Sequence, residues 1–376
     1  MSAPQTRAPR GAHPGPGRSE RERAARRRRL AVRRRRAAML AVLAAVALVV
    51  LIVSLGGGGG RGGGRGGRRA LGARRAGATR GGPGAESTPP ALGVRVVGTL
   101  PVALQDAAAA TLPDGRVVLL GGLDASDVST AAVSVLAGGR SAPLTTLPEP
   151  QHDAAAVTLG DNVYLFGGGQ VESYSHILGL EPGAARVREA GTLPGPASDV
   201  AAASVGQSAY VVGGYDGVSA LDQILAWRPG QAPVVAARLP GGLRYAAVAA
   251  VEGRVIIAGG SEGEVARDAI LSFDPVHGTV RQIGRLPQPL THAAAVTLGR
   301  WVYVIGGRGA AQSSQSSAIV AIDPRTGATR PAGRLPSPLS DMSAARAGGG
   351  ILLAGGQSPE GTSAGILELE PRAAAR

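Results

Sequence analysis

Short apolar runs alternate with turn residues through most of the chain after residue 93. Residues 151–168 read QHDAAAVTLGDNVYLFGG and residues 290–307 read LTHAAAVTLGRWVYVIGG. Each stretch has a small-residue run, a turn, and an apolar run that stops at two glycines. A third run then ends in Asp-Pro or Glu-Pro, and a fourth leads into Leu-Pro. Four short runs bounded by Gly, Pro and Asp predict four β-strands joined by tight turns.

This unit occurs six times. The Leu-Pro pairs begin at Leu100, Leu147, Leu193, Leu239, Leu286 and Leu335, and the Gly-Gly pairs begin at Gly121, Gly167, Gly213, Gly259, Gly306 and Gly355. Successive Gly-Gly pairs are 46, 46, 46, 47 and 49 residues apart. A period of this length predicts one four-stranded sheet per repeat, and therefore an all-β, six-bladed propeller.

The repeat resembles the Kelch repeat, in which a double glycine closes the second strand, and the resemblance covers residues 94–371. It implies a Kelch-type β-propeller. Kelch repeats carry a Tyr and then a Trp after the glycines, and here only Trp227 and Phe273 approach this pattern. The third strand carries instead the isoleucines Ile177, Ile224, Ile270 and Ile319. We therefore expect an aliphatic, alanine-rich core between the blades.

The two ends of the repeat region predict how the ring closes. The last repeat has a third strand, residues 364–371 (AGILELEP), and no fourth strand after it. Residues 94–101 (VRVVGTLP) precede the first repeat and end as the fourth strands do elsewhere. We expect this N-terminal strand to complete the C-terminal sheet, because pairing removes an exposed strand edge.

The first ninety residues differ from the repeats. Residues 1–36 form an arginine-rich segment, expected to be a disordered cytoplasmic tail, and residues 37–55 contain no charge. A helix of that length spans roughly 30 Å, the thickness of a bilayer core. The alternative, a cleaved signal peptide, has an apolar stretch of about 7–15 residues. We therefore expect an uncleaved signal anchor, followed by a flexible Gly/Arg-rich linker at 56–90 and the propeller domain at 91–376.

Arginine counts predict the orientation of the transmembrane segment. Thirteen arginines precede it and seven follow it before residue 81. Positive residues favour the cytoplasmic side, so the N-terminus is expected in the cytoplasm and the propeller outside it. The Ala-, Gly-, Arg- and Pro-rich composition without lysine is typical of a bacterial protein with GC-rich coding.

The formal net charge of +14 does not indicate a nucleic-acid-binding protein. Residues 1–90 hold 20 Arg against 3 Glu, a net charge of +17, and residues 91–376 hold 20 Arg against 23 acidic residues, a net charge of −3. The basic part is explained by membrane topology and contact with anionic lipid. We expect the partner of residues 37–55 to be the lipid bilayer and the propeller to be monomeric.

The sequence has no cysteine, which excludes disulfides, thiolate catalysis and Cys-based zinc sites. It also excludes the Cys-Tyr cross-link of galactose oxidase, a copper enzyme that resembles a Kelch propeller. No phosphate-binding loop, nucleophile elbow or His-Glu-x-x-His motif is present. No cofactor is therefore predicted.

The variable loops follow the double glycines, and in an antiparallel blade these loops share one face with the Leu-Pro connections. Variable loops on a rigid scaffold commonly bind ligands. The candidates on this loop-bearing face are Asp124, Asp127, Glu172, Tyr174, Tyr215, Asp216, Glu262, Arg267 and Arg308.

One position on this face recurs six residues after each Leu of Leu-Pro. It holds Asp106, Asp153, Asp199, Tyr245, His292 and Asp341. Sixfold pseudosymmetry should place these residues around the mouth of the central channel. Four carboxylates and an imidazole there could hold a cation or a polyhydroxylated ligand. The competing interpretation is that each Asp stabilises its own turn.

These features favour a protein- or glycan-binding module. A second hypothesis is a sugar-modifying enzyme, because N-acetylneuraminate epimerase also resembles a Kelch propeller. A third is a structural envelope protein without a specific ligand. A closed pocket with a perturbed carboxylate beside Arg267 or Arg308 would favour the enzyme, and an open, shallow surface would favour binding.

Overall fold

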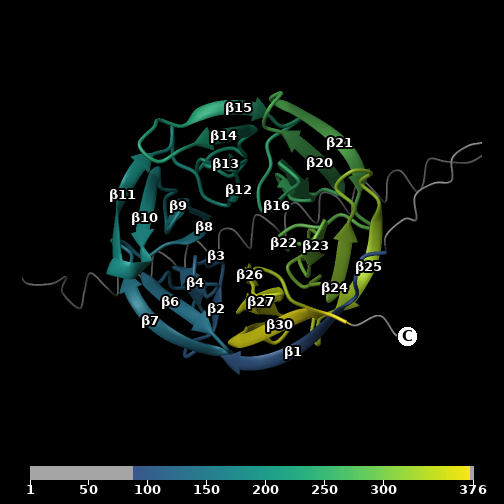
Figure 1. The fold of residues 1–376 in the computed structure, drawn as a ribbon, viewed down its shortest axis with the longest axis horizontal. Coiled ribbons are helices and arrows are strands. Elements are labelled where there is room, and N and C mark those ends of the chain that lie inside the picture. Colours follow the sequence, from purple (N-terminus) through teal and green to yellow (C-terminus); the bar gives the residue numbers. More distant parts are fainter. Residues whose placement is uncertain (1–87, 373–376) are drawn as a thin grey trace, which may run out of the picture. The chain divides into compact units, whose positions relative to one another are not determined.

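The computed structural model describes residues 88–372, which form six four-stranded antiparallel sheets arranged around a central axis (Figure 1). The first strand of each repeat lies innermost and the fourth lies on the circumference. The predicted all-β, six-bladed propeller is thus confirmed.

We number the blades in chain order. Blade 1 contains β3 (Ala108–Thr111), β4 (Val117–Leu120), β6 (Ala132–Ala137) and β7 (Arg140–Thr146); blade 2 contains β8 (His152–Leu159), β9 (Asn162–Gly169), β10 (His176–Glu181) and β11 (Arg186–Thr192); blade 3 contains β12 (Ala201–Val205), β13 (Ser208–Val212), β14 (Gln223–Trp227) and β15 (Val234–Arg238). Blade 4 contains β16 (Ala247–Val251), β17 (Arg254–Ala258), β20 (Ala269–Asp274) and β21 (Thr279–Arg285); blade 5 contains β22 (Ala294–Leu298), β23 (Trp301–Ile305), β24 (Ala318–Ile322) and β25 (Thr329–Arg334); blade 6 contains β26 (Ser343–Ala347), β27 (Gly350–Ala354), β30 (Gly365–Pro371) and β1 (Leu92–Thr99). The remaining elements are the short strands β2 (Leu104–Gln105), β5 (Leu123–Asp124), β18 (Ser261–Glu262), β19 (Val265–Ala266), β28 (Gln357–Ser358) and β29 (Gly361–Thr362), and the 3₁₀-helix η1 (Pro182–Ala184).

The N-terminal strand closes the ring as the sequence predicted. Strand β1 pairs antiparallel with β30, from Leu92 opposite Pro371 to Thr99 opposite Gly365. Figure 1 shows β1 on the outside of β30, so the last blade is built from both ends of the repeat region. This pairing covers the edge of β30 that the chain would otherwise expose.

Apolar side chains fill the interfaces between neighbouring blades. The third-strand isoleucines Ile177, Ile224, Ile270 and Ile319 are all buried there. Aromatic contacts occur at two interfaces, where Trp227 packs edge-on against Tyr164 and Phe166, and Phe273 packs against Tyr210. The core is therefore mainly aliphatic, with these aromatic pairs as exceptions.

Each double glycine joins its blade to the next one. The first glycine has a left-handed backbone, and a Cβ on Gly213 would lie 2.1 Å from the carbonyl oxygen of Leu243 in the following connection. The second glycine donates its amide to that same carbonyl, at 2.8 Å from Gly214 to Leu243. Only glycine permits both the backbone angle and the close approach. The repeated Gly-Gly is therefore required for contact between blades.

The predicted cytoplasmic tail and transmembrane segment lie outside the described residues, as does most of the predicted linker. Within residues 88–372, no helix is long and apolar enough to cross a bilayer.

The closure of the ring can be tested at Leu92, which is 1% exposed and packs in the core between blades 5 and 6. Because Leu→Ala in a buried site removes apolar contacts and leaves a cavity, Leu92→Ala should lower the free energy of unfolding by about 2–5 kcal/mol. The control is Val96→Ala on the same strand, where the side chain is 65% exposed and the cost should stay below about 1 kcal/mol. Equal effects of the two substitutions in chemical denaturation would contradict closure by β1.

Candidate functional site

The six residues at the predicted recurring position surround the mouth of the central channel. They are Asp106, Asp153, Asp199, Tyr245, His292 and Asp341, and we call them the channel-mouth ring. All six have a left-handed backbone, with φ between 52° and 58°. Five of them lie two residues before the innermost strand of their blade, and Asp153 is the second residue of β8. The left-handed region is several-fold enriched in Asp and His but unusual for a bulky residue such as Tyr.

The backbone of the channel-mouth ring forms a closed circle of hydrogen bonds. Each residue donates its amide to the carbonyl oxygen of the equivalent residue in the preceding blade. The six distances are 3.1 Å (Asp153 to Asp106), 2.8 Å (Asp199 to Asp153), 3.2 Å (Tyr245 to Asp199), 3.1 Å (His292 to Tyr245), 3.0 Å (Asp341 to His292) and 2.9 Å (Asp106 to Asp341). The left-handed backbone at these six positions thus accompanies hydrogen bonds between neighbouring blades.

The side chains of the ring line one small cavity of about 130 Å³ at the channel mouth. In the described structure, none of the four carboxylates accepts a hydrogen bond from an amide of its own turn. The competing interpretation therefore needs modification. The left-handed backbone itself favours Asp at this position. The carboxyls contact one another and the guanidinium groups of Arg244 and Arg308.

Burial raises the pKa of three carboxyls of the ring, Asp106, Asp153 and Asp341. The pKa of Asp106 lies well above its usual value because of burial, then because of the charges on Asp153 and Asp341 and a hydrogen bond with the Asp341 carboxyl. Burial likewise raises the pKa of Asp153 strongly, and repulsion from Asp199 and Asp341 and a hydrogen bond with Asp199 add to it. Burial also raises the pKa of Asp341, although Ser340 and Arg308 oppose this. The arrangement therefore opposes simultaneous ionisation of all the carboxyls of the ring.

A guanidinium balances the charge on one side of the ring. The Nε of Arg244 donates to Asp199 Oδ2 at 2.5 Å, and its Nη2 contacts the same oxygen. The Arg244 guanidinium also lies over the Tyr215 ring, 4.1 Å from its centroid, in a cation–π contact. Asp199 is 3% exposed, so this pairing compensates a buried charge.

His292 occupies the ring as a neutral imidazole. Arg308 Nη2 donates to its Nε2 at 3.0 Å, which assigns the proton of the neutral ring to Nδ1. Burial, together with Arg308 and Arg244, lowers the pKa of His292 to about 2. The ring stacks on Tyr245 with centroids 3.7 Å apart, and its Nδ1 is buried without a hydrogen-bond partner in the described structure. A buried polar atom without a partner lowers the stability of the folded protein.

Most loop-face candidates make local contacts. Asp124 and Asp216 accept amide hydrogen bonds within their own turns. Glu262 forms an ion pair with Arg267, and both side chains are about half exposed. The contacts of these four residues stabilise the loops themselves.

The other candidates differ in how they relate to the ring. Asp127 accepts a hydrogen bond from Gln105, and the Tyr174 hydroxyl accepts one from Gln170. Glu172 is exposed. Only Tyr215 and Arg308 join the ring, Tyr215 through Arg244 and Arg308 through His292.

Sequence reasoning did not include Arg244 among the site residues. A signal for it exists in the position directly before each ring residue, which is polar in all six repeats. This position holds Gln105, His152, Ser198, Arg244, Thr291 and Ser340. In four repeats it forms an isolated backbone bridge to the residue after the double glycine, as Arg244 does with Ser261. Its side chain therefore lies between the ring and the variable loop.

The residues 88–372 contain no group of three or more His, Asp and Glu side chains arranged to hold a metal ion. Protonated carboxyls are poor cation ligands, since a cation must first displace their protons.

Comparison with known proteins supports the fold. A solved structure titled "Structure of YjhT" matches with a TM-score of 0.62 and 15% identity, over 73% of this chain and 97% of that chain. In total 835 solved chains match, so the fold is widespread and does not by itself indicate a function. No protein-family model and no curated protein matches the sequence. The chain thus has the fold of a six-bladed β-propeller, and the Kelch repeat remains a resemblance carried by its double glycines.

The raised pKa of Asp153 can be tested by its pH dependence. A raised pKa stabilises the folded protein at low pH, and this stabilisation is lost as pH rises above the ordinary value of 3.8. Asp153→Asn cannot ionise, so its melting temperature relative to the parent should increase between pH 4 and pH 8. Each unit of raised pKa corresponds to about 1.4 kcal/mol, and each kcal/mol to roughly 2–4 °C. The exposed Asp114→Asn should show no such increase. A melting temperature of Asp153→Asn that does not rise relative to the parent between pH 4 and pH 8 would contradict the assignment.

Proposed function

We propose that the chain is a membrane-tethered, extracytoplasmic propeller that binds a hydroxyl-rich ligand, a glycan or a polar protein surface, through its loop-bearing face. Residues 37–55 anchor it in the bilayer, and the channel-mouth ring is the centre of the binding surface. The observation that carries this proposal is that four carboxyls, a tyrosine and a histidine, one from each blade, line a single cavity.

A hydroxyl group both donates and accepts hydrogen bonds. Burial raises the pKa of Asp106 and of Asp153, which favours their protonated, hydrogen-bond-donating form. The Asp199 carboxylate beside them accepts hydrogen bonds, as it does from Arg244. This mixed array suits hydroxyls better than a cation, which needs acceptors only.

The size of the cavity favours recognition over enclosed catalysis. A volume of about 130 Å³ is below the roughly 300–1,000 Å³ of pockets that enclose a small molecule. It fits a single projecting group, such as one edge of a sugar ring, while the variable loops contact the remainder of the ligand. This supports a binding module.

A sugar-modifying enzyme of the N-acetylneuraminate epimerase-like kind is the second candidate. The observation in its favour is the raised pKa of Asp341 beside Arg308, whose Nε lies 4.0 Å from Asp341 Oδ2. Perturbed carboxyls next to arginine are common in active sites. Arg267, in contrast, pairs with Glu262 away from the ring.

The binding role is tested by a glycan array probed with the full chain and with Asp153→Asn/Asp341→Asn. The double variant should fold and lose at least about tenfold in affinity for any glycan that the parent binds, since it replaces two carboxyls of the ring. Asp114→Asn on the opposite face is the control and should bind as the parent does.

Two outcomes would contradict this proposal. A rise in melting temperature on adding calcium that disappears in the double variant would indicate a cation site instead. Turnover of a bound sugar by the parent, lost in the same variant, would favour the enzyme.

The orientation is tested by adding protease to intact cells. Cleavage between residues 56 and 87 should release a propeller fragment, because the linker is expected outside the cytoplasm, while a cytoplasmic marker protein stays intact. Release of the fragment from lysed cells only would reverse the proposed topology.

A further inference from the structure

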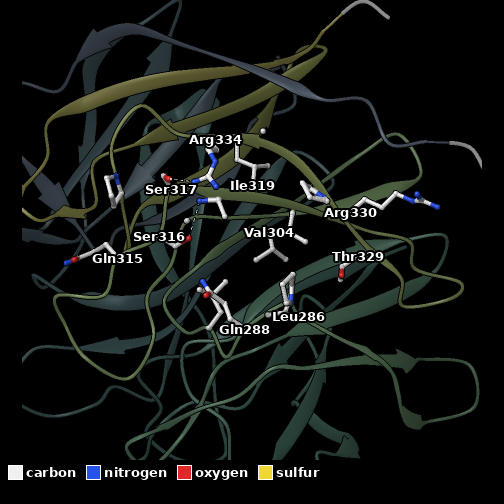
Figure 2. A pocket seen from close by; sticks show the side chains of 18 of the residues that line it. Leu286, Gln288, Val304, Gln315, Ser316, Ser317, Ile319, Thr329, Arg330 and Arg334 are labelled. Carbon is white, nitrogen blue, oxygen red and sulfur yellow. Dashed lines mark hydrogen bonds between the residues drawn. The ribbon is translucent and has the colours of Figure 1, made fainter.

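Blade 5 contains a pocket that is separate from the channel-mouth ring. It has a volume of about 640 Å³ and lies between the connection that follows β21 and strands β24 and β25 (Figure 2). None of the side chains that line it is acidic, whereas Arg330 and Arg334 are among them. The volume is in the usual range for small-molecule pockets.

The equivalent position in blades 3 and 4 holds an ion pair. The arginine directly before Leu-Pro pairs there with an aspartate before the third strand, Arg238 with Asp222 and Arg285 with Asp268, both at 2.7 Å. The backbone hydrogen bonds are also equivalent in the two blades, because the amides of Leu239 and Leu286 donate to the carbonyls of these aspartates.

Blade 5 keeps the arginine and lacks the aspartate. Leu335 donates its amide to the Ser317 carbonyl at 2.8 Å, so Ser317 occupies the aspartate position. Arg334 Nη1 lies 3.4 Å from Ser317 Oγ and, among the described residues, has no carboxylate within 4.0 Å. Figure 2 shows Arg334 beside Ser317 at the pocket wall. Arg334 is exposed, so its guanidinium is open to a bound anion that would take the place of this aspartate.

Part of the pocket wall is apolar, and this part is widened by a smaller side chain. Val320 follows the bulge of the third strand and is partly exposed, whereas Leu225 and Leu271 are buried at the same position of blades 3 and 4. Val304 and Leu286 lie at the centre of the pocket in Figure 2. One methylene less at Val320 leaves room beside these residues.

We propose that this pocket binds a small organic carboxylate with an apolar body. Its carboxylate takes the place of the missing aspartate at Arg334, and its hydrocarbon part covers Val320, Val304 and Leu286. An Arg–carboxylate pair is charge-assisted and directional, and burial of the apolar body adds affinity. The site is independent of the channel-mouth ring, since no ring residue lines it.

The experiment titrates the purified full chain with three probes by calorimetry: hexanoate, hexan-1-ol and acetate. Hexanoate should bind at least about tenfold more tightly than either of the others, because only hexanoate has both the charge and the apolar chain. Arg334→Gln and Ser317→Asp should each weaken hexanoate binding by about tenfold or more, the second because it supplies the internal carboxylate that blades 3 and 4 have.

The matched control is Arg238→Gln in blade 3, which should leave hexanoate binding unchanged. Asp153→Asn/Asp341→Asn should also leave it unchanged, which separates this site from the proposed glycan site. Thermal melting checks that each variant is folded. Absence of hexanoate binding at millimolar concentration, equal binding of hexan-1-ol or acetate, or binding that survives both Arg334→Gln and Ser317→Asp would overturn the proposal.

Discussion

The fold and the candidate site both depend on hydrogen bonds between the backbones of neighbouring blades. Six of them link the channel-mouth ring into a closed circle, and six more join the second glycine of each pair to the next connection. The carbonyl that accepts from the glycine lies two residues before the ring residue, as Leu243 does before Tyr245. The double glycine therefore fixes the loop that presents the ring side chain. The circle also joins the last blade to the first, since Asp106 donates its amide to the Asp341 carbonyl.

Symmetry in the backbone does not produce symmetry in the side chains. Blades 1, 2, 3 and 6 contribute aspartates to the channel mouth, whereas blades 4 and 5 contribute Tyr245 and His292, with Arg244 and Arg308 beside them. Blade 5 also differs at the pocket, through Val320 and Ser317. Both proposed sites thus arise where a repeat departs from its neighbours, on a scaffold that holds the remaining positions constant.

The sequence predicted the architecture in detail because the turn residues and glycine pairs determine local structure and recur with a fixed repeat period. The number of blades, the four strands per blade, the closure by the N-terminal strand and the convergence of the six ring positions all followed from residue spacing. The raised pKa of Asp106 and of Asp153 did not, because it results from burial and from charges on other blades. Arg244 was missed for the same reason. Its role depends on Tyr215 and Asp199, which are close only in the folded protein. The pocket in blade 5 required comparison of equivalent contacts, because a serine in place of an aspartate carries no signal by itself.

Hydrogen exchange at the six amides of the channel-mouth ring tests the central claim most directly. If the circle is closed, the amides of Asp106, Asp153, Asp199, Tyr245, His292 and Asp341 exchange only through global unfolding, with the same protection as the innermost strands. Exchange of these amides at the rate of the variable loops, while the strands stay protected, would show that the blades are not joined in this way.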